Sequence, residues 1–149
     1  LAMQRSLLVG LSASSIATIL GTGAAIAIAK GQFRFRLGHG LEVMSFISLI
    51  IPELVFALSL LMWFFLLKIP LGLTTVILAH VTFCLSFVML TVGARVTALD
   101  PTLEDAARDL GASEFRILFK VTLPLLRPAI VAAFVLCFIL SFDDFLITY

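Results

Sequence analysis

Four long apolar segments, separated by polar ones, dominate the hydrophobic pattern of this chain. They cover approximately residues 6–29, 41–67, 73–92 and 125–147. Each reaches the roughly 20 apolar residues that a membrane-crossing helix requires. The first is rich in Gly, Ala and Ser and is expected to pack closely against other helices. The pattern predicts an all-α, polytopic helical membrane protein, in which residues 1–149 form a single, partial transmembrane domain.

The longest polar interval, from Asp100 to Pro128, predicts two short helices between membrane spans. It holds five of the nine acidic residues and four of the ten basic ones. Asp100 is placed to cap the first helix, Pro101 occupies its first position, and Gly111 ends it. Small apolar residues recur at helical spacing along one face, namely Leu103, Ala106, Ala107 and Leu110. This face leaves room for another surface to come close.

Ser113 predicts the start of the second helix, which covers 114–121. Pro124 and Pro128 then limit its continuation, because proline interrupts helical hydrogen bonding. From the residues alone, an amphipathic pair of surface helices explains this interval as well as a docking surface does.

Within the interval, an acid-Ala-Ala triplet is followed at fixed spacing by Gly, a branched apolar residue and Leu-Pro. These residues are Asp105-Ala106-Ala107, Gly111, Val121 and Leu123-Pro124. The spacing resembles the EAA loop of type I ABC-importer permeases, with Asp in place of the family's Glu and Val in place of its Ile. The resemblance implies that 100–124 is a cytoplasmic loop that couples to an ATP-hydrolysing subunit. The implied coupling residues are Glu104, Asp105, Ala106, Ala107, Gly111, Val121, Leu123 and Pro124.

Composition supports a membrane protein and excludes several functions. Hydrophobic residues make up 62% of the chain and charged residues 13%, against about 25% charged in typical soluble domains. The net charge is +1 and the basic residues are not clustered, so no nucleic-acid partner is expected. Gly21-Thr22-Gly23 lacks the spacing of a phosphate-binding loop. ATP and its Mg²⁺ are therefore expected on a partner ATPase, with no cofactor on this chain.

Neither a metal site nor enzymatic activity is expected. Cys84 and Cys137 lie far apart inside apolar segments and read as small buried or lipid-facing residues. His39 and His80 have no partner at ligand spacing, and no Ser–His arrangement stands at a plausible spacing.

The basic residues orient the spans. If the loop at 30–40 and the interval at 93–127 are cytoplasmic, eight of the ten Lys and Arg residues lie inside, against Arg5 and Lys68 outside. The positive-inside rule then places both ends of the chain on the outer side. The resemblance requires the same orientation and implies a multi-pass protein of the prokaryotic inner membrane.

Three acids lie within predicted spans, where an ionised group costs about 2.5–3.5 kcal/mol on insertion scales. Glu53, directly after Pro52, is expected near mid-membrane, and Asp143 and Asp144 toward the outer end of the last span. They are candidates for lining the pathway of a cationic solute. The alternative stays open that Glu53 caps a kinked helix and the aspartates occupy an aqueous helix end.

Three segments resemble permeases of spermidine/putrescine importers: IPELVFALSLLMWF (51–64), AHVTFCLSFVMLTVGAR (79–95) and SFDDFLITY (141–149). The resemblance implies a permease that translocates polyamine delivered by a solute-binding protein. Its implied partners are ATPase subunits and a second permease, identical or homologous. Alternatives left open are a permease for ferric iron, thiamine or an opine, and a secondary transporter or channel without an ATPase. Family members have further spans, so the chain is expected to be a fragment.

Overall fold

The structure is a computed structural model that describes residues 2–31, 38, 40, 43, 45–47, 50–51 and 53–143. Within these residues the chain consists of helices and the turns between them, which confirms the predicted all-α class. The elements are α1 (Ala2–Ala29), α3 (Glu53–Leu66), α4 (Leu73–Thr97), α5 (Thr102–Asp109), α6 (Glu114–Ile117), the π-helical turn η1 (Leu118–Thr122) and α7 (Leu123–Asp143).

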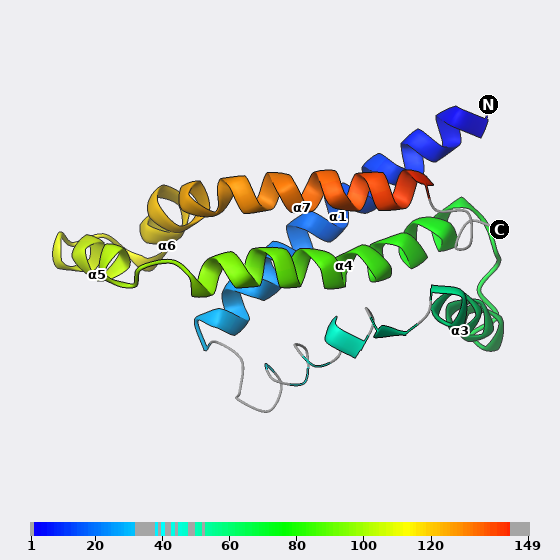
Figure 1. Cartoon of the computed structure of the whole chain (residues 1–149), viewed down its shortest axis with the longest axis horizontal. Helices are drawn as coiled ribbons and strands as arrows, with labels where there is room; N and C mark the ends of the chain where they lie inside the picture. The colour runs from blue at the N-terminus through cyan, green and yellow to red at the C-terminus, as the bar shows by residue number, and fades with distance from the viewer. Residues whose placement is uncertain are drawn as a thin grey trace.

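The helices α1, α4 and α7 pack together as an elongated bundle (Figure 1), with α1 and α4 running in one direction and α7 in the other. Of the described helices, three runs are long and apolar enough to cross a membrane: most of α1, the whole of α4, and the continuous run that ends in α7. The helix α3 is apolar but shorter. It meets α4 through Phe56, whose ring centroid lies 5.8 Å from that of Phe83.

Small residues allow the bundle to pack closely. Ala13 and Ala17 of α1, Cys84 of α4 and Ala133 of α7 are completely buried in one core. The predicted close packing of the first span is therefore confirmed. In lipid this matters because helices associate through close backbone approach and van der Waals contact rather than through a hydrophobic driving force.

The predicted spans coincide with described helices in three places. α1 covers 6–29, α4 covers 73–92, and α7 begins shortly before 125. In the predicted span 41–67, the described helix α3 occupies the second half. Pro52, where a kink was expected, lies outside the described residues.

The second short helix does not stop at the prolines. α6 continues through η1 into α7, which gives one helical run from Glu114 to Asp143 with Pro128 inside it. The expectation that Pro124 and Pro128 limit this helix is therefore wrong. Directly before Pro124, the N–H of Leu123 donates to the carbonyl five residues back, and the wider π turn gives a proline ring room. Membrane helices also tolerate proline because neighbouring helices satisfy the freed backbone groups.

Candidate functional site

Local hydrogen bonds fix the ends of α5. The backbone N–H of Thr102 donates to Oδ1 of Asp100 at 2.9 Å. Hydrogen bonds from the backbone and side chain of Thr102 lower the pKa of Asp100. At the other end Gly111 has φ +80°, a left-handed conformation that favours glycine, and its N–H donates to the Arg108 carbonyl at 2.8 Å. The predicted cap and stop are confirmed.

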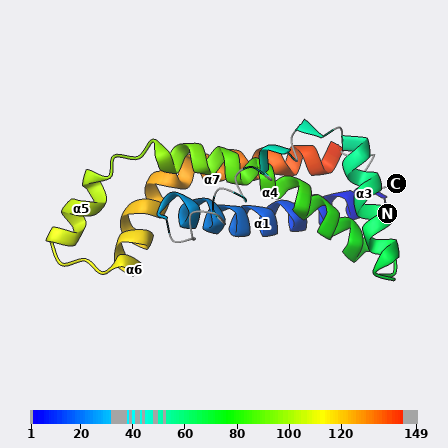
Figure 2. The same cartoon turned by 90° about the horizontal axis from the view of Figure 1, so that it is seen from below.

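The short helix after α5 also starts as predicted. The side chain of Ser113 accepts a hydrogen bond from the N–H of Arg116 at 3.4 Å. α5 and α6 together project beyond the ends of the bundle helices, as Figure 2 shows. The loop is therefore an ordered pair of short helices at one end of the molecule.

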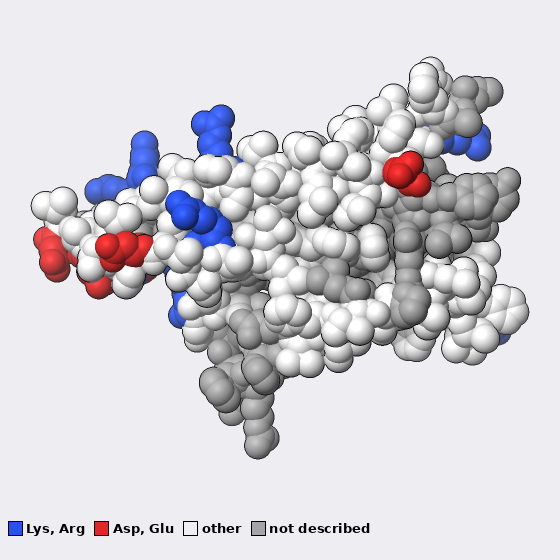
Figure 3. Space-filling model, viewed as in Figure 1, with Lys and Arg blue, Asp and Glu red and all other residues white. Residues whose placement is uncertain are grey.

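This projecting end carries exposed apolar side chains. Leu103 is 46% exposed and Leu110 is 89% exposed. The next turns expose Phe115 and Phe119, whose ring centroids lie 4.5 Å apart. Acidic side chains gather around the same end, with Lys and Arg beside them, while most of the bundle surface in view is uncharged (Figure 3). An apolar surface with a charged surround is typical of a protein–protein contact.

Charged side chains on the surface hold α5 to α6. Arg108 Nη1 lies 2.7 Å from Asp105 Oδ1, and Arg108 Nε lies 2.6 Å from Glu114 Oε1. The hydrogen bond from Arg108 lowers the pKa of Glu114, and Glu114 in turn raises the pKa of Arg108. All three side chains are exposed, so these pairs orient the two helices more than they stabilise them.

Glu104 is different, because its side chain is only 20% exposed and points into the junction with the bundle. Lys30 Nζ lies 2.9 Å from its carboxylate oxygens, and the Thr122 hydroxyl donates to Oε1 at 2.6 Å. Arg108 Nη2 is 3.5 Å away. Burial raises the pKa of Glu104, but the hydrogen bonds from Thr122 and Lys30 and the charges of Lys30 and Arg108 lower it by more. The pKa therefore lies below its usual value of 4.5.

The predicted coupling residues fall into two groups. Asp105 and Ala106 are exposed on α5. Val121 of η1 and Leu123 at the start of α7 are half-buried, on either side of the Thr122 that holds Glu104. Sequence reasoning included Glu104 but missed Lys30 and Thr122. The spacing of 74 residues between Lys30 and Glu104 offers no local signal.

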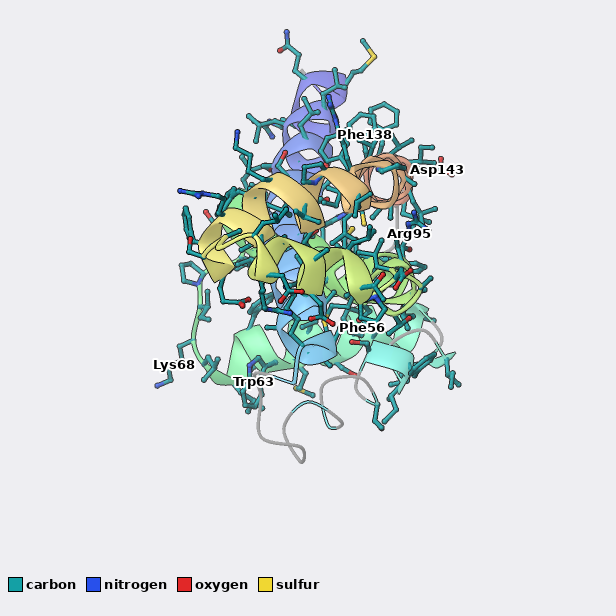
Figure 4. All side chains as sticks on the ribbon, turned by 90° about the vertical axis from the view of Figure 1, so that its left-hand side faces the viewer. Phe56, Trp63, Lys68, Arg95, Phe138 and Asp143 are labelled. Atoms are coloured by element: carbon teal, nitrogen blue, oxygen red, sulfur yellow. The ribbon has the colours of Figure 1, made fainter. Side chains whose placement is uncertain are left out.

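The intramembrane acids are described only in part. Asp143 is exposed and ends α7, at the end of the bundle away from α5. In Figure 4 it lies on the α7 side with Phe138, while Trp63 and Lys68 point outward on the α3 side. Glu53 is the first residue of α3 rather than the middle of a described helix. Its side chain and Asp144 lie outside the described residues.

A buried Ser–His pair was also missed. Ser141 Oγ and His80 Nδ1 are 2.8 Å apart between α7 and α4, although 61 residues separate them in sequence. The sequence analysis found no Ser and His at a plausible spacing, and this pair forms only because the fold brings α4 and α7 together. Both side chains are buried, so the pair joins two helices inside the bundle. Among the described residues, no three His, Cys, Asp or Glu side chains are close enough to hold a metal ion.

Comparison with known protein families matches residues 17–149 to the binding-protein-dependent transport system inner membrane component. The chain belongs to this family. The family resemblance seen in the sequence is thus confirmed. The chain is a multi-pass inner membrane protein, consistent with its three described helices that are long and apolar enough to cross a membrane.

Individual relatives are similar over almost the whole chain. The chain is 42% identical to the spermidine/putrescine transport system permease protein PotC of Escherichia coli (strain K12), over 99% of this chain and 55% of that protein. It is 41% identical to PotC of Haemophilus influenzae, over 96% of this chain and 55% of that protein. It is 38% identical to the putrescine transport system permease protein PotI of Escherichia coli (strain K12), over 98% of this chain and 54% of that protein. The chain spans about half the length of the curated relatives it matches.

Proposed function

We propose that the chain is the membrane-spanning permease of an ATP-driven importer that translocates spermidine or putrescine. The observation that carries the proposal is the helix α5, which presents the Asp105-Ala106 part of the EAA-type spacing at the exposed end of a membrane bundle. The names of the relatives, spermidine/putrescine and putrescine permeases, supply the solute class.

In this proposal α5 docks on a partner ATPase. Leu103 and Leu110 offer apolar contact, and the alanines between them let the partner backbone approach. ATP and Mg²⁺ are bound and ATP is hydrolysed by that partner, so this chain acts as a non-catalytic transport subunit. Closure of the ATPases moves α5, and the bundle switches between inward-facing and outward-facing forms.

The remaining partners act at other surfaces. A second permease, identical or homologous, completes the pathway, and an extracytoplasmic solute-binding protein delivers the polyamine. A polyamine is a flexible polycation, so carboxylates are the chemically suitable lining. Asp143, Asp144 and Glu53 are the proposed lining residues.

The test uses the full-length permease, reconstituted with its ATPase and binding protein. Binding protein loaded with spermidine or putrescine is expected to stimulate ATP hydrolysis above the unloaded protein. The stimulation is expected to disappear when Asp105 and Ala106 are both replaced by bulky residues. Stimulation by another solute, such as ferric iron, thiamine or an opine, would retain the permease and exclude the polyamine. Transport driven by an ion gradient without an ATPase would exclude the importer.

A further inference from the structure

We propose that Glu104 is a positioning residue that ties α5 to two membrane helices at once, through Lys30 and Thr122. This inference rests on the proposed function, in which a partner ATPase moves α5. It adds the route by which that movement reaches the bundle. The Glu104 carboxylate contacts Lys30 and Thr122, and through them it transmits the movement of α5 to α1 and to α7.

The contact with α1 is made by the residue that follows it. Lys30 immediately follows α1, and its N–H donates to the Ile26 carbonyl at 2.9 Å, which continues the helical bonding of α1. Its Nζ lies 2.9 Å from both Glu104 carboxylate oxygens. A displacement of α5 along the α1 axis therefore pulls on the end of α1.

The contact with α7 passes through the π turn. Thr122 is the last residue of η1, only 1% exposed, and its hydroxyl donates to Glu104 Oε1 at 2.6 Å. Thr is branched at Cβ and has few rotamers in a helix, so the hydroxyl follows the backbone closely. π turns interrupt regular helix bonding and occur frequently at functional sites. Glu104 thus bonds to the one irregular turn between α6 and α7.

A cavity beside the linkage separates part of α5 from the end of α4. Its volume is about 270 Å³, and it lies between Lys30, Glu104 and Thr122 on one side and Thr97 of α4 and Asp100 of the following linker on the other. Close packing across this gap would couple α5 to α4 as well. Instead, the polar contacts of Glu104 outside α5 are with Lys30, directly after α1, and with Thr122 of η1, directly before α7.

The other acids of the loop do not duplicate this role. Glu114 is exposed and pairs with Arg108 within the loop. It orients α5 against α6, and its hydrogen bonds stay within the loop, although the charge of Lys30 also contributes to lowering its pKa. Glu114→Gln is therefore a matched control, because it removes a carboxylate and an ion pair while leaving in place the hydrogen bonds of Glu104 with Lys30 and Thr122.

The experiment measures polyamine taken up per ATP hydrolysed in the reconstituted full-length transporter. Glu104→Gln and Thr122→Val are expected to keep ATPase association and stimulated hydrolysis while lowering the uptake ratio roughly fivefold or more. Lys30→Glu alone is expected to do the same. Combining Lys30→Glu with Glu104→Lys restores the opposite charges, so the ratio is expected to rise about twofold or more above that of Lys30→Glu alone. Recovery stays partial, because the carboxylate that accepts from Thr122 is absent. Glu114→Gln is expected to match wild type.

The outcomes separate the linkage from the proposed function. An unchanged ratio in both Glu104→Gln and Thr122→Val would overturn the linkage and leave the permease function intact. If Glu104→Gln does not assemble, Thr122→Val and the charge-reversed pair decide, and no rescue by that pair would count against the linkage. Wild-type transporter without ATPase stimulation would overturn the proposed function and, with it, this role of Glu104.

Discussion

Cys84 and Cys137 each donate a thiol hydrogen bond to the backbone carbonyl of the other residue. The sulfur–oxygen distances are 3.7 Å from Cys84 and 3.5 Å from Cys137, across a sequence separation of 53 residues. Neither cysteine is in a disulfide, and both are completely buried. For a side chain to reach the opposite backbone in both directions, α4 and α7 must lie close at this level.

Enlarging Cys84 is therefore expected to force α4 and α7 apart. Cys84→Leu should destabilise the protein by about 1–3 kcal/mol, the usual effect of overpacking a tight core. Cys84→Ala should cost less, because it only removes a weak hydrogen bond and one sulfur atom. Thermal unfolding of the full-length protein in detergent measures both, with Ile139→Leu on the exposed face of α7 as control. Equal stability of the Leu variant would mean that the helices are not in contact there.

Replacement by alanine is expected to have opposite effects on stability at Gly21 and at Gly23. A Cβ on Gly21 would lie 2.6 Å from Cγ1 of Val88 and 2.7 Å from its Cβ, whereas a Cβ on Gly23 meets no atom within 4 Å. Gly21→Ala should lower stability by about 1–3 kcal/mol, because Val88 has few rotamers with which to yield. Gly23→Ala should leave it unchanged or raise it, since alanine is the better helix former.

Unfolding measurements on the two alanine variants check this prediction. A second substitution tests whether Val88 causes the loss of stability. Val88→Ala removes the clashing methyl groups, so combining it with Gly21→Ala should recover part of the loss. A Gly23→Ala variant as unstable as Gly21→Ala would contradict the described α1–α4 contact.

Replacing Gly111 is expected to uncouple ATP hydrolysis from uptake. Its φ of +80° is costly for most residues with a Cβ, although no atom lies within 4 Å of where that Cβ would be. Gly111→Val should cost about 1–2 kcal/mol in backbone strain and shift α5 relative to α6. Gly111→Asn is the control, because asparagine tolerates this conformation. Unchanged uptake per ATP in the Val variant would show that the C-terminal stop of α5 does not matter for coupling.

The linkage at Glu104 is expected to withstand mild acid. Because the pKa of Glu104 is lowered on folding, its stabilising effect is fully present above 4.5 and is lost as the pH falls through the lower pKa of the folded protein. Amide hydrogen exchange in α5 should therefore stay slow from neutral pH to about 4.5 and accelerate below it, after correction for intrinsic rates. In Glu104→Gln, exchange should already be fast at neutral pH. A loss of protection well above 4.5 would assign the transition to another group.

Neutralising Asp143, the last residue of α7, together with the next residue in sequence tests the solute class. Asp143→Asn and Asp144→Asn together should reduce polyamine uptake by roughly tenfold, if their negative charge attracts the polycation. Stimulation of the ATPase by loaded binding protein should remain, because α5 lies at the other end of the bundle. Uptake equal to wild type would favour a solute other than a polyamine.

The sequence alone determined the features that depend on a few neighbouring residues. The apolar segments predicted a helical membrane protein, and Asp100, Gly111 and Ser113 correctly marked the ends of the loop helices. Each of these signals acts through backbone groups within a few residues, so no knowledge of the fold is needed to read it. The residue spacing by which the loop resembles the family can likewise be recognised in a short stretch of sequence, without the fold.

Tertiary structure decided which distant residues meet. Lys30 and Glu104, His80 and Ser141, and Cys84 and Cys137 are separated by 74, 61 and 53 residues, and the packing of α1, α4 and α7 brings each pair together. It also decided that the helix continues past both prolines, with the π turn η1 directly before Leu123-Pro124 and Pro128 inside α7. Packing in lipid depends on the fit of small side chains between helices, which no local spacing specifies.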